Sequence, residues 1–404
     1  MAVTPPAQTE PFDVFLTHAE QAALSVRQAL ADTFWDRLER TPLVEGDAVV
    51  FLYRGEARTV RLLGDTNSWN RPDPLRRIEG TDLWFRREPA EPEARLEYLF
   101  LVDSEAEGFG AETAGTPDPT NPHRVLSAFG PFSEVAMPGY AYPEVFAPVR
   151  DGTPGSAAGL DRHVLPAGAL PYAHEALVYT PPGYARDEAA RYPTVIFLDG
   201  QDYVAFAHAP AVLDWLANRG EAVPVVAVFL DPPNRHSYTA PNRATEYALN
   251  DDFVAFLAGE LVPFVDARYR TQAAPEARLV VGDSYAGLAA VYAPLRRPDV
   301  FGGGYSQSGY HSYQNNRLVR ILREAEAPPI RLCLDVGTYE RSVGAGLLPD
   351  DETDFTAANR RLQAALAARG YDAEYAEYPE GHTWGTWRAH LLDALPHFFP
   401  SHKR

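Results

Sequence analysis

The chain has 404 residues, of which 46% are hydrophobic, and this length and composition predict two or three packed domains and exclude a disordered protein. The formal net charge of −19 argues against nucleic acid or an anionic membrane surface as a partner. The single cysteine, Cys333, excludes an internal disulfide and a cysteine-based metal site, and its apolar neighbours predict a buried strand position.

The first ten residues contain no basic segment followed by an apolar core, so we expect no signal peptide and a cytoplasmic location. No apolar run approaches the roughly 20 residues that span a bilayer, so we expect no membrane partner.

The first part of the chain begins with apolar residues at helical spacing over residues 12–40, which predicts one or two helices. Short apolar runs separated by polar turns then predict strands at 49–54, 59–63, 84–87 and 96–102. Strands without intervening helices are typical of a β-sandwich. We therefore expect residues 1–150 to form an N-terminal helical segment and an Ig-like sandwich domain. The Gly, Ala, Ser and Pro residues of 149–160 predict a linker.

Residues 165–404 alternate between strand-like and helix-like segments. The predicted strands are 176–179, 194–198, 223–230, 278–281, 331–334 and 374–378. The predicted helices are 212–218, 253–264, 285–296, 356–369 and one that starts near 387. Nearly continuous apolar strands indicate a mostly parallel sheet with helices on both faces, so this second domain is predicted to be α/β.

A candidate nucleophile lies at the strongest motif of the second domain. Arg278–Gly287 predicts a strand, a sharp turn with Ser284 at its tip, and a helix, which is the nucleophile elbow of the α/β-hydrolase fold. Gly282 stands two residues before the serine, and Ala286 occupies the position that is usually glycine. The alternative is a serine that caps an ordinary helix.

A serine nucleophile needs a histidine base and a carboxylate that orients it, and in this fold both follow the serine in the chain. The later histidines are His311, His382, His390, His397 and His402. We choose His382, because it lies in a loop between a strand and the last helix. For the acid we choose Glu340, in the loop after the apolar strand run Ile330–Val336. The rival carboxylates are Asp335, Asp351 and Asp354.

Acyl transfer also needs two backbone N–H donors for the oxyanion. The first is assigned to Tyr285, directly after the serine. The second is assigned to Gln201, in the loop after strand 194–198, with Gly200 as the alternative.

With these residues in place, the sequence resembles the enterochelin (enterobactin) esterase family, within the esterase D group. The resemblance is carried by Leu177–Tyr184, Phe197–Gln201, Arg243 with Glu246, 256–264, Gly337–Arg341, Gly381–His382 with Trp387–Arg388, and, in the N-terminal part, 50–57 and 84–87. It implies a sandwich domain before the hydrolase domain, a triad of Ser284, Glu340 and His382, and cytoplasmic hydrolysis of the ester bonds of an iron-loaded tri-catecholate siderophore.

Such a trianionic substrate would require a basic pocket, for which the candidates are Arg243, Arg341 and Arg388, with Arg54 from the first domain. Each arginine is equally well explained by a surface or structural ion pair. Trp384 and Trp387 are candidates to stack on a catechol ring, with a core position as the alternative. No metal ligand spacing such as His-Glu-x-x-His is present, so iron is expected only as part of the substrate, with no other cofactor.

Two other functions are compatible with these residues. One is a general carboxylesterase for feruloyl or acetyl esters, in which the sandwich domain is accessory. The other is a hydrolase fold kept as a non-catalytic binding protein, for which Ala286 is the sole support. The sequence predicts no particular oligomeric state.

Overall fold

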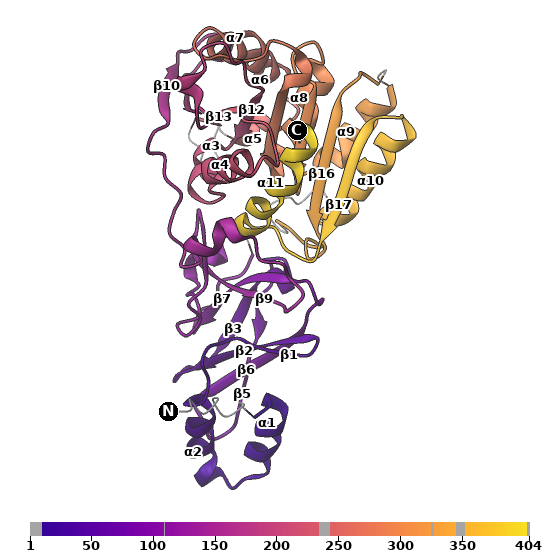
Figure 1. The fold of residues 1–404 in the computed structure, drawn as a ribbon. Coiled ribbons are helices and arrows are strands. Elements are labelled where there is room, and N and C mark those ends of the chain that lie inside the picture. The colour runs from indigo at the N-terminus through magenta and orange to yellow at the C-terminus, as the bar shows by residue number, and fades with distance from the viewer. Residues whose placement is uncertain (1–9, 109, 234–242, 325–326, 345–351, 402–404) are drawn as a thin grey trace.

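The computed structural model describes residues 10–108, 110–233, 243–324, 327–344 and 352–401. Figure 1 shows two bodies stacked end to end, with the early part of the chain at one end and the α/β body at the other. No helix in the described ranges is long and apolar enough to cross a membrane.

The early part of the chain holds two helices and two antiparallel sheets, which we call the N-terminal domain. The helices are α1 (Phe12–Gln21) and α2 (Leu24–Trp35). The first sheet has the order β1 (Leu43–Glu45), β2 (Ala48–Arg54), β6 (Leu83–Pro89), β5 (Arg76–Arg77). The second has the order β4 (Asp73–Pro74), β3 (Val60–Gly64), β7 (Arg95–Val102), β9 (Gly130–Ala136), β8 (Arg124–Ser127).

Strand β2 is buried on both sides because its side chains alternate between two cores. Val49 and Phe51 point into the core between the two sheets. Val50 and Leu52 point the other way, where Phe12 of α1 packs on them. A strand with period-2 alternation can therefore be apolar throughout, and the predicted sandwich forms with the helices packed on its outer face.

The second body, which we call the hydrolase domain, is built on an eight-stranded sheet. Its order is β10 (Asp161–Leu165), β11 (His174–Tyr179), β13 (Val226–Asp231), β12 (Thr194–Leu198), β14 (Arg278–Asp283), β15 (Gly303–Gln307), β16 (Arg331–Gly337), β17 (Asp372–Tyr378). The strands from β13 to β17 are parallel, and the other two pairings are antiparallel.

Helices cover both faces of this sheet (Figure 1). One face carries α3 (Gly200–Ala205), α4 (Ala209–Arg219) and α11 (Trp384–Phe398). The other carries α5 (Arg243–Tyr247), α6 (Asp251–Phe256), the π-helical turn Leu257–Leu261, α7 (Val262–Asp266), α8 (Ser284–Arg296), α9 (Tyr313–Glu324) and α10 (Phe355–Ala368). The predicted α/β-hydrolase fold with an N-terminal sheet domain is confirmed.

The strands predicted from apolar runs are all present, within a few residues of their expected bounds. The strands not predicted from the sequence are β1, β4, β5, β8 and β9 in the N-terminal domain and β10 and β15 in the hydrolase domain. Strand β10 directly follows the predicted linker, and β15, with the residues Gly-Gly-Tyr-Ser-Gln, lacks β-branched side chains. The domain boundaries 1–150 and 165–404 stay predictions, and β10 begins before the second of them.

Candidate active site

Ser284 lies at the sharp turn between β14 and α8. Its φ of +53° is in the left-handed region, which non-glycine residues adopt at a cost and mainly at functional turns. A Cβ on Gly282 would come within 2.4 Å of the Ala286 carbonyl oxygen and 2.7 Å of its methyl group. The turn therefore requires glycine at position 282, while the buried Ala286 methyl fits without opening the elbow.

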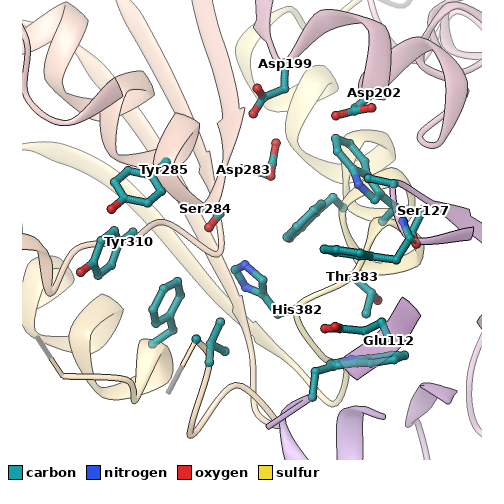
Figure 2. A pocket seen from close by; sticks show the side chains of 18 of the residues that line it. Glu112, Ser127, Asp199, Asp202, Asp283, Ser284, Tyr285, Tyr310, His382 and Thr383 are labelled. Carbon is teal, nitrogen blue, oxygen red and sulfur yellow. Dashed lines mark hydrogen bonds between the residues drawn. The ribbon is translucent and has the colours of Figure 1, made fainter. Parts of the chain in front are cut away.

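Glu340 and His382 are brought together from the loops that follow β16 and β17. The Nδ1 atom of His382 lies 2.7 Å from Oε2 of Glu340. The other carboxylate oxygen accepts from the Ser308 hydroxyl at 2.6 Å and from the Gly337 N–H at 2.8 Å. This fully buried carboxylate is thus fixed by three partners. In Figure 2 the Ser284 hydroxyl and the His382 ring point toward one another.

The rival acids have other partners. Asp354 accepts from the Ala357 N–H at 2.8 Å and caps α10. Asp335 is buried within β16 and accepts from the Tyr305 hydroxyl. Asp351 and His402 lie outside the described residues.

The other histidines are also bound elsewhere. His311 is buried against Ser306, and burial lowers its pKa to about 3, so it stays neutral. His397 lies 3.0 Å from Glu374 at the end of α11. Although burial opposes a charge on His390, contact with Glu380 raises its pKa to about 9.

The Ser284 hydroxyl opens into a cavity of about 610 Å³ whose walls come from both domains. The residues contributed by the N-terminal domain are Ser68, Trp69, Asn70, Glu112, Ser127, Ala128, Phe129 and Phe132. Those from the hydrolase domain include His382, Thr383, Trp384, Trp387, Tyr285, Tyr310 and Phe355. Aromatic side chains therefore face the site from both sides. None of the first group was predicted from the sequence, because residues of a separate sandwich carry no motif for a site on another domain.

Of the predicted substrate-binding arginines, Arg243 alone lines this cavity. Its guanidinium lies 2.6 Å from Asp199 and 3.0 Å from Asp283, so one positive charge is shared by two carboxylates. Burial raises the pKa of Asp283 well above its usual range, even though Arg243 opposes the shift. Asp199 therefore already balances the positive charge of Arg243, and Asp283 accepts a further hydrogen bond from it.

The other predicted arginines lie elsewhere. Arg388 is buried between the domains, with its guanidinium 3.0 Å from the Tyr142 hydroxyl and 3.5 Å from Glu134. Arg341 is exposed and donates to the Thr338 carbonyl. Arg54 pairs with Asp82 in the sandwich. The expectation of a basic pocket formed by these residues is wrong.

Trp387 also lines the cavity, as predicted, and it contacts the proposed catalytic residues as well. Its Nε1–H donates to the Ser308 hydroxyl at 2.9 Å, and its ring meets the His382 ring edge to face at 5.0 Å. It therefore buttresses both the acid and the histidine.

The predicted oxyanion donors have different outcomes. Tyr285 lies in the first turn of α8 and lines the cavity. The backbone N–H of Gln201 donates to Asp231 at 2.9 Å, so this group is not offered to the cavity, and the assignment to Gln201 is corrected. Gly200, the alternative, is buried at the start of α3.

A protein-family model described as "Putative esterase" matches residues 168–398, more than half of the chain. The chain belongs to this esterase family. It is a serine carboxylic-ester hydrolase, and it is similar to the enterobactin esterases. The iron(III) enterobactin esterase of Dickeya dadantii is 26% identical over 92% of this esterase and 94% of that protein.

Solved structures show the same fold. The enterobactin esterase of Shigella flexneri, determined in the presence of enterobactin, is 23% identical, covers 91% of this chain and 97% of its own, and has a TM-score of 0.71. The ferric enterobactin esterase of Salmonella typhimurium is 20% identical, with coverages of 91% and 98% and a TM-score of 0.72.

Proposed function

We propose that Ser284 is the acyl-accepting nucleophile, with His382 as its base and Glu340 as the orienting acid. His382 takes the serine proton as the hydroxyl attacks the ester carbonyl, and it returns the proton to the leaving alcohol. Glu340 keeps the Nδ1 proton in place and stabilises the imidazolium that forms. Water then attacks the acyl-enzyme by the same route. The backbone N–H groups of Tyr285 and Gly200 are the proposed oxyanion donors.

We propose further that the substrate is a catecholate siderophore of the enterobactin type. The observation that carries this proposal is the 26% identity to an iron(III) enterobactin esterase over 92% of the chain, which includes the N-terminal domain as well as the esterase region. The aromatic residues of that domain in the cavity wall, Trp69, Phe129 and Phe132, supply flat surfaces suited to catechol rings.

A second candidate substrate is a neutral ester of an aromatic acid, such as a feruloyl ester. It is favoured by the charge state of the cavity, in which the guanidinium of Arg243 is shared by Asp199 and Asp283. A trianionic ferric complex would find no unshared charge on this residue. Iron-free enterobactin, whose catechols are largely protonated at neutral pH, avoids that conflict within the first proposal.

The experiment compares iron-free enterobactin, ferric enterobactin, methyl ferulate and p-nitrophenyl butyrate as substrates for the wild type and Ser284→Ala. Chromatography with mass detection should show linear trimers, dimers and monomers of dihydroxybenzoylserine with the wild type alone. If the wild type cleaves p-nitrophenyl butyrate and methyl ferulate but forms no product from enterobactin, the siderophore proposal is wrong and a feruloyl-type ester is the better candidate.

A further inference from the structure

Two buried side chains of the N-terminal domain, Arg95 and Glu97, hold the segment that carries His382. Arg95, at the start of β7, is 1% exposed. Its Nε donates to Glu380 at 2.7 Å, and its backbone N–H donates to the Pro379 carbonyl at 3.2 Å. Its Nη2 reaches the hydroxyl of Thr386 at 3.1 Å. Arg95 is therefore hydrogen-bonded to the chain on both sides of His382.

Glu97, two residues further along β7, binds the same segment. Its Oε1 accepts from Arg95 at 2.8 Å, from the Thr383 hydroxyl at 2.8 Å and from the Gly385 N–H at 3.2 Å. A Cβ on Gly385 would lie 2.2 Å from this same oxygen. The first turn of α11 is thus fitted against β7 with no room for a side chain between them.

The loop that carries Glu340 is bound by the same domain. The Ser68 hydroxyl donates to the Tyr339 carbonyl at 2.5 Å, and the Asn70 amide donates to the Ser342 hydroxyl at 3.0 Å. The N-terminal domain consequently contacts the segments on either side of the His382–Glu340 hydrogen bond.

Charge makes Arg95 the centre of this contact. Its guanidinium faces three carboxylates that are each about as buried as it is, Glu97, Glu134 and Glu380. Burial alone would raise the pKa of Glu380, but Arg95 and His390 outweigh it and hold this pKa below its usual value. Removal of Arg95 would leave buried carboxylates without their counter-ion, and the segment around His382 would have to move to hydrate them.

We propose that Arg95 is a positioning residue of the esterase reaction, which acts across the domain interface to hold His382 between Ser284 and Glu340. The proposal rests on the catalytic role proposed for His382. Arg95 itself does not line the cavity and touches no reacting atom.

The test measures hydrolysis of p-nitrophenyl acetate, a substrate too small to need the N-terminal wall of the cavity. Arg95→Met should lower kcat by about 100-fold, the loss expected from misplacing a catalytic group by an ångström. KM should stay within about 3-fold, because substrate binding is not touched. Arg95→Lys, which keeps the charge but not the planar fork, should recover part of kcat.

Arg278→Met is the matched control. Arg278 is buried to a similar degree and pairs with Asp266 at 2.7 Å, but it lies at the opposite end of β14 from Ser284. Both methionine variants should lower Tm, whereas Arg95→Met alone should lower kcat by two orders of magnitude. Equal effects of the two variants on kcat would overturn the proposal.

Glu380→Gln decides the question if Arg95→Met does not fold. It keeps the size of the side chain and removes the charge that Arg95 and His390 share, so kcat should fall about 10-fold at constant KM. A wild-type kcat in this variant would overturn the proposal. Two other results would bear on the proposed function and not on Arg95. A wild-type kcat in His382→Ala would show that the proposed triad is wrong. A failure of the wild type to cleave enterobactin would show only that the proposed substrate is wrong.

Discussion

Glu340 shows how much of the candidate site depends on the hydrogen bonds of one buried side chain. One oxygen of its carboxylate is occupied by the Ser308 hydroxyl and the Gly337 N–H, so the other oxygen is presented to His382 in a fixed direction. Glu340→Gln keeps the shape but not the charge that stabilises the imidazolium. We expect kcat for p-nitrophenyl butyrate to fall by roughly 10⁴-fold, as for a triad acid replaced by its amide.

Asp354→Asn is the control for this prediction. Asp354 caps α10, and asparagine caps a helix as well as aspartate does. Both kcat and Tm should therefore stay close to the wild type. A loss of activity confined to Asp354→Asn would transfer the role of the acid to Asp354.

Phe129 tests the contribution of the N-terminal domain to substrate binding. It lines the cavity and is 39% exposed, so its removal leaves no cavity in a core. Phe129→Ala should raise KM for enterobactin about 10-fold, the loss of one aromatic contact, with kcat and Tm unchanged. Steady-state kinetics on enterobactin and p-nitrophenyl acetate measure this, and an equal rise of KM for both esters would contradict it.

At the level of single residues, the sequence predicted the groups that its motifs define and failed for those defined by their partners. Ser284, Glu340 and His382 follow one another in the order that the fold requires. Glu340 is hydrogen-bonded to His382, and Ser284 and His382 line the same cavity, while their catalytic roles stay predictions. Gln201 was misassigned because its N–H partner, Asp231, lies on another strand. Arg388 was misassigned because its neighbours belong to the N-terminal domain.

Among the elements, strands were predictable where their residues are apolar and β-branched. The side chains of Thr194–Leu198 alternate between the two faces of the central sheet, with Val195 in one core and Ile196 in the other. Strand β15 could not be found in this way. Its glycines allow α8 to approach closely, since a Cβ on Gly304 would lie 2.3 Å from the Ala290 carbonyl oxygen. The glycines of β15 therefore lower its intrinsic β-propensity but allow the close packing of α8.

Helix α11 is tied to the loop of His382 by the contact between His390 and Glu380, at 2.8 Å. The pKa of His390 is raised from 6.5 to about 9. A raised folded-state pKa gives stability that is complete below pH 6.5, the unfolded value, and is lost as the pH rises through 9. This shift corresponds to about 3 kcal/mol.

We therefore expect His390→Gln to lower the free energy of unfolding by about 3 kcal/mol more at pH 6 than at pH 10. Urea unfolding of the wild type and the variant at both pH values measures the difference. A penalty that is the same at pH 6 and pH 10 would show that His390 is not charged in the folded protein.

For the whole molecule, the fit between the two domains is the feature that links fold to activity. Gly381, next to His382, faces Asp65 of the N-terminal domain, and a Cβ there would lie 2.0 Å from a carboxylate oxygen. Gly381→Ala should cost about 1–3 kcal/mol of stability by overpacking. It should also reduce kcat at least 10-fold, because the displaced segment carries the histidine. Thermal unfolding and p-nitrophenyl acetate kinetics measure the two effects.

Gly259→Ala is the matched control for this glycine substitution. Gly259 is exposed in the π-helical turn, and a Cβ there meets nothing within 4 Å. This change should raise stability by roughly 0.5–1 kcal/mol with no effect on kcat. Equal loss of activity in both variants would exclude a special role for the fit at Gly381.

The domain order was predictable because strands without helices give way to alternating strands and helices along the sequence. The contact between the domains was not predictable. Arg95 and Glu380 are 285 positions apart, and no motif links the strand of Arg95 to the loop of Glu380. Nothing local distinguishes a buried arginine of a sandwich strand from an exposed one, so the interface and the shared cavity required the structure.

The role of Ser284 is tested by identifying the residue that a fluorophosphonate modifies, by digestion and tandem mass spectrometry. We expect one adduct per chain, on Ser284, which is absent in Ser284→Ala and forms far more slowly in His382→Ala. An adduct on another serine, or undiminished labelling of Ser284→Ala, would contradict this role.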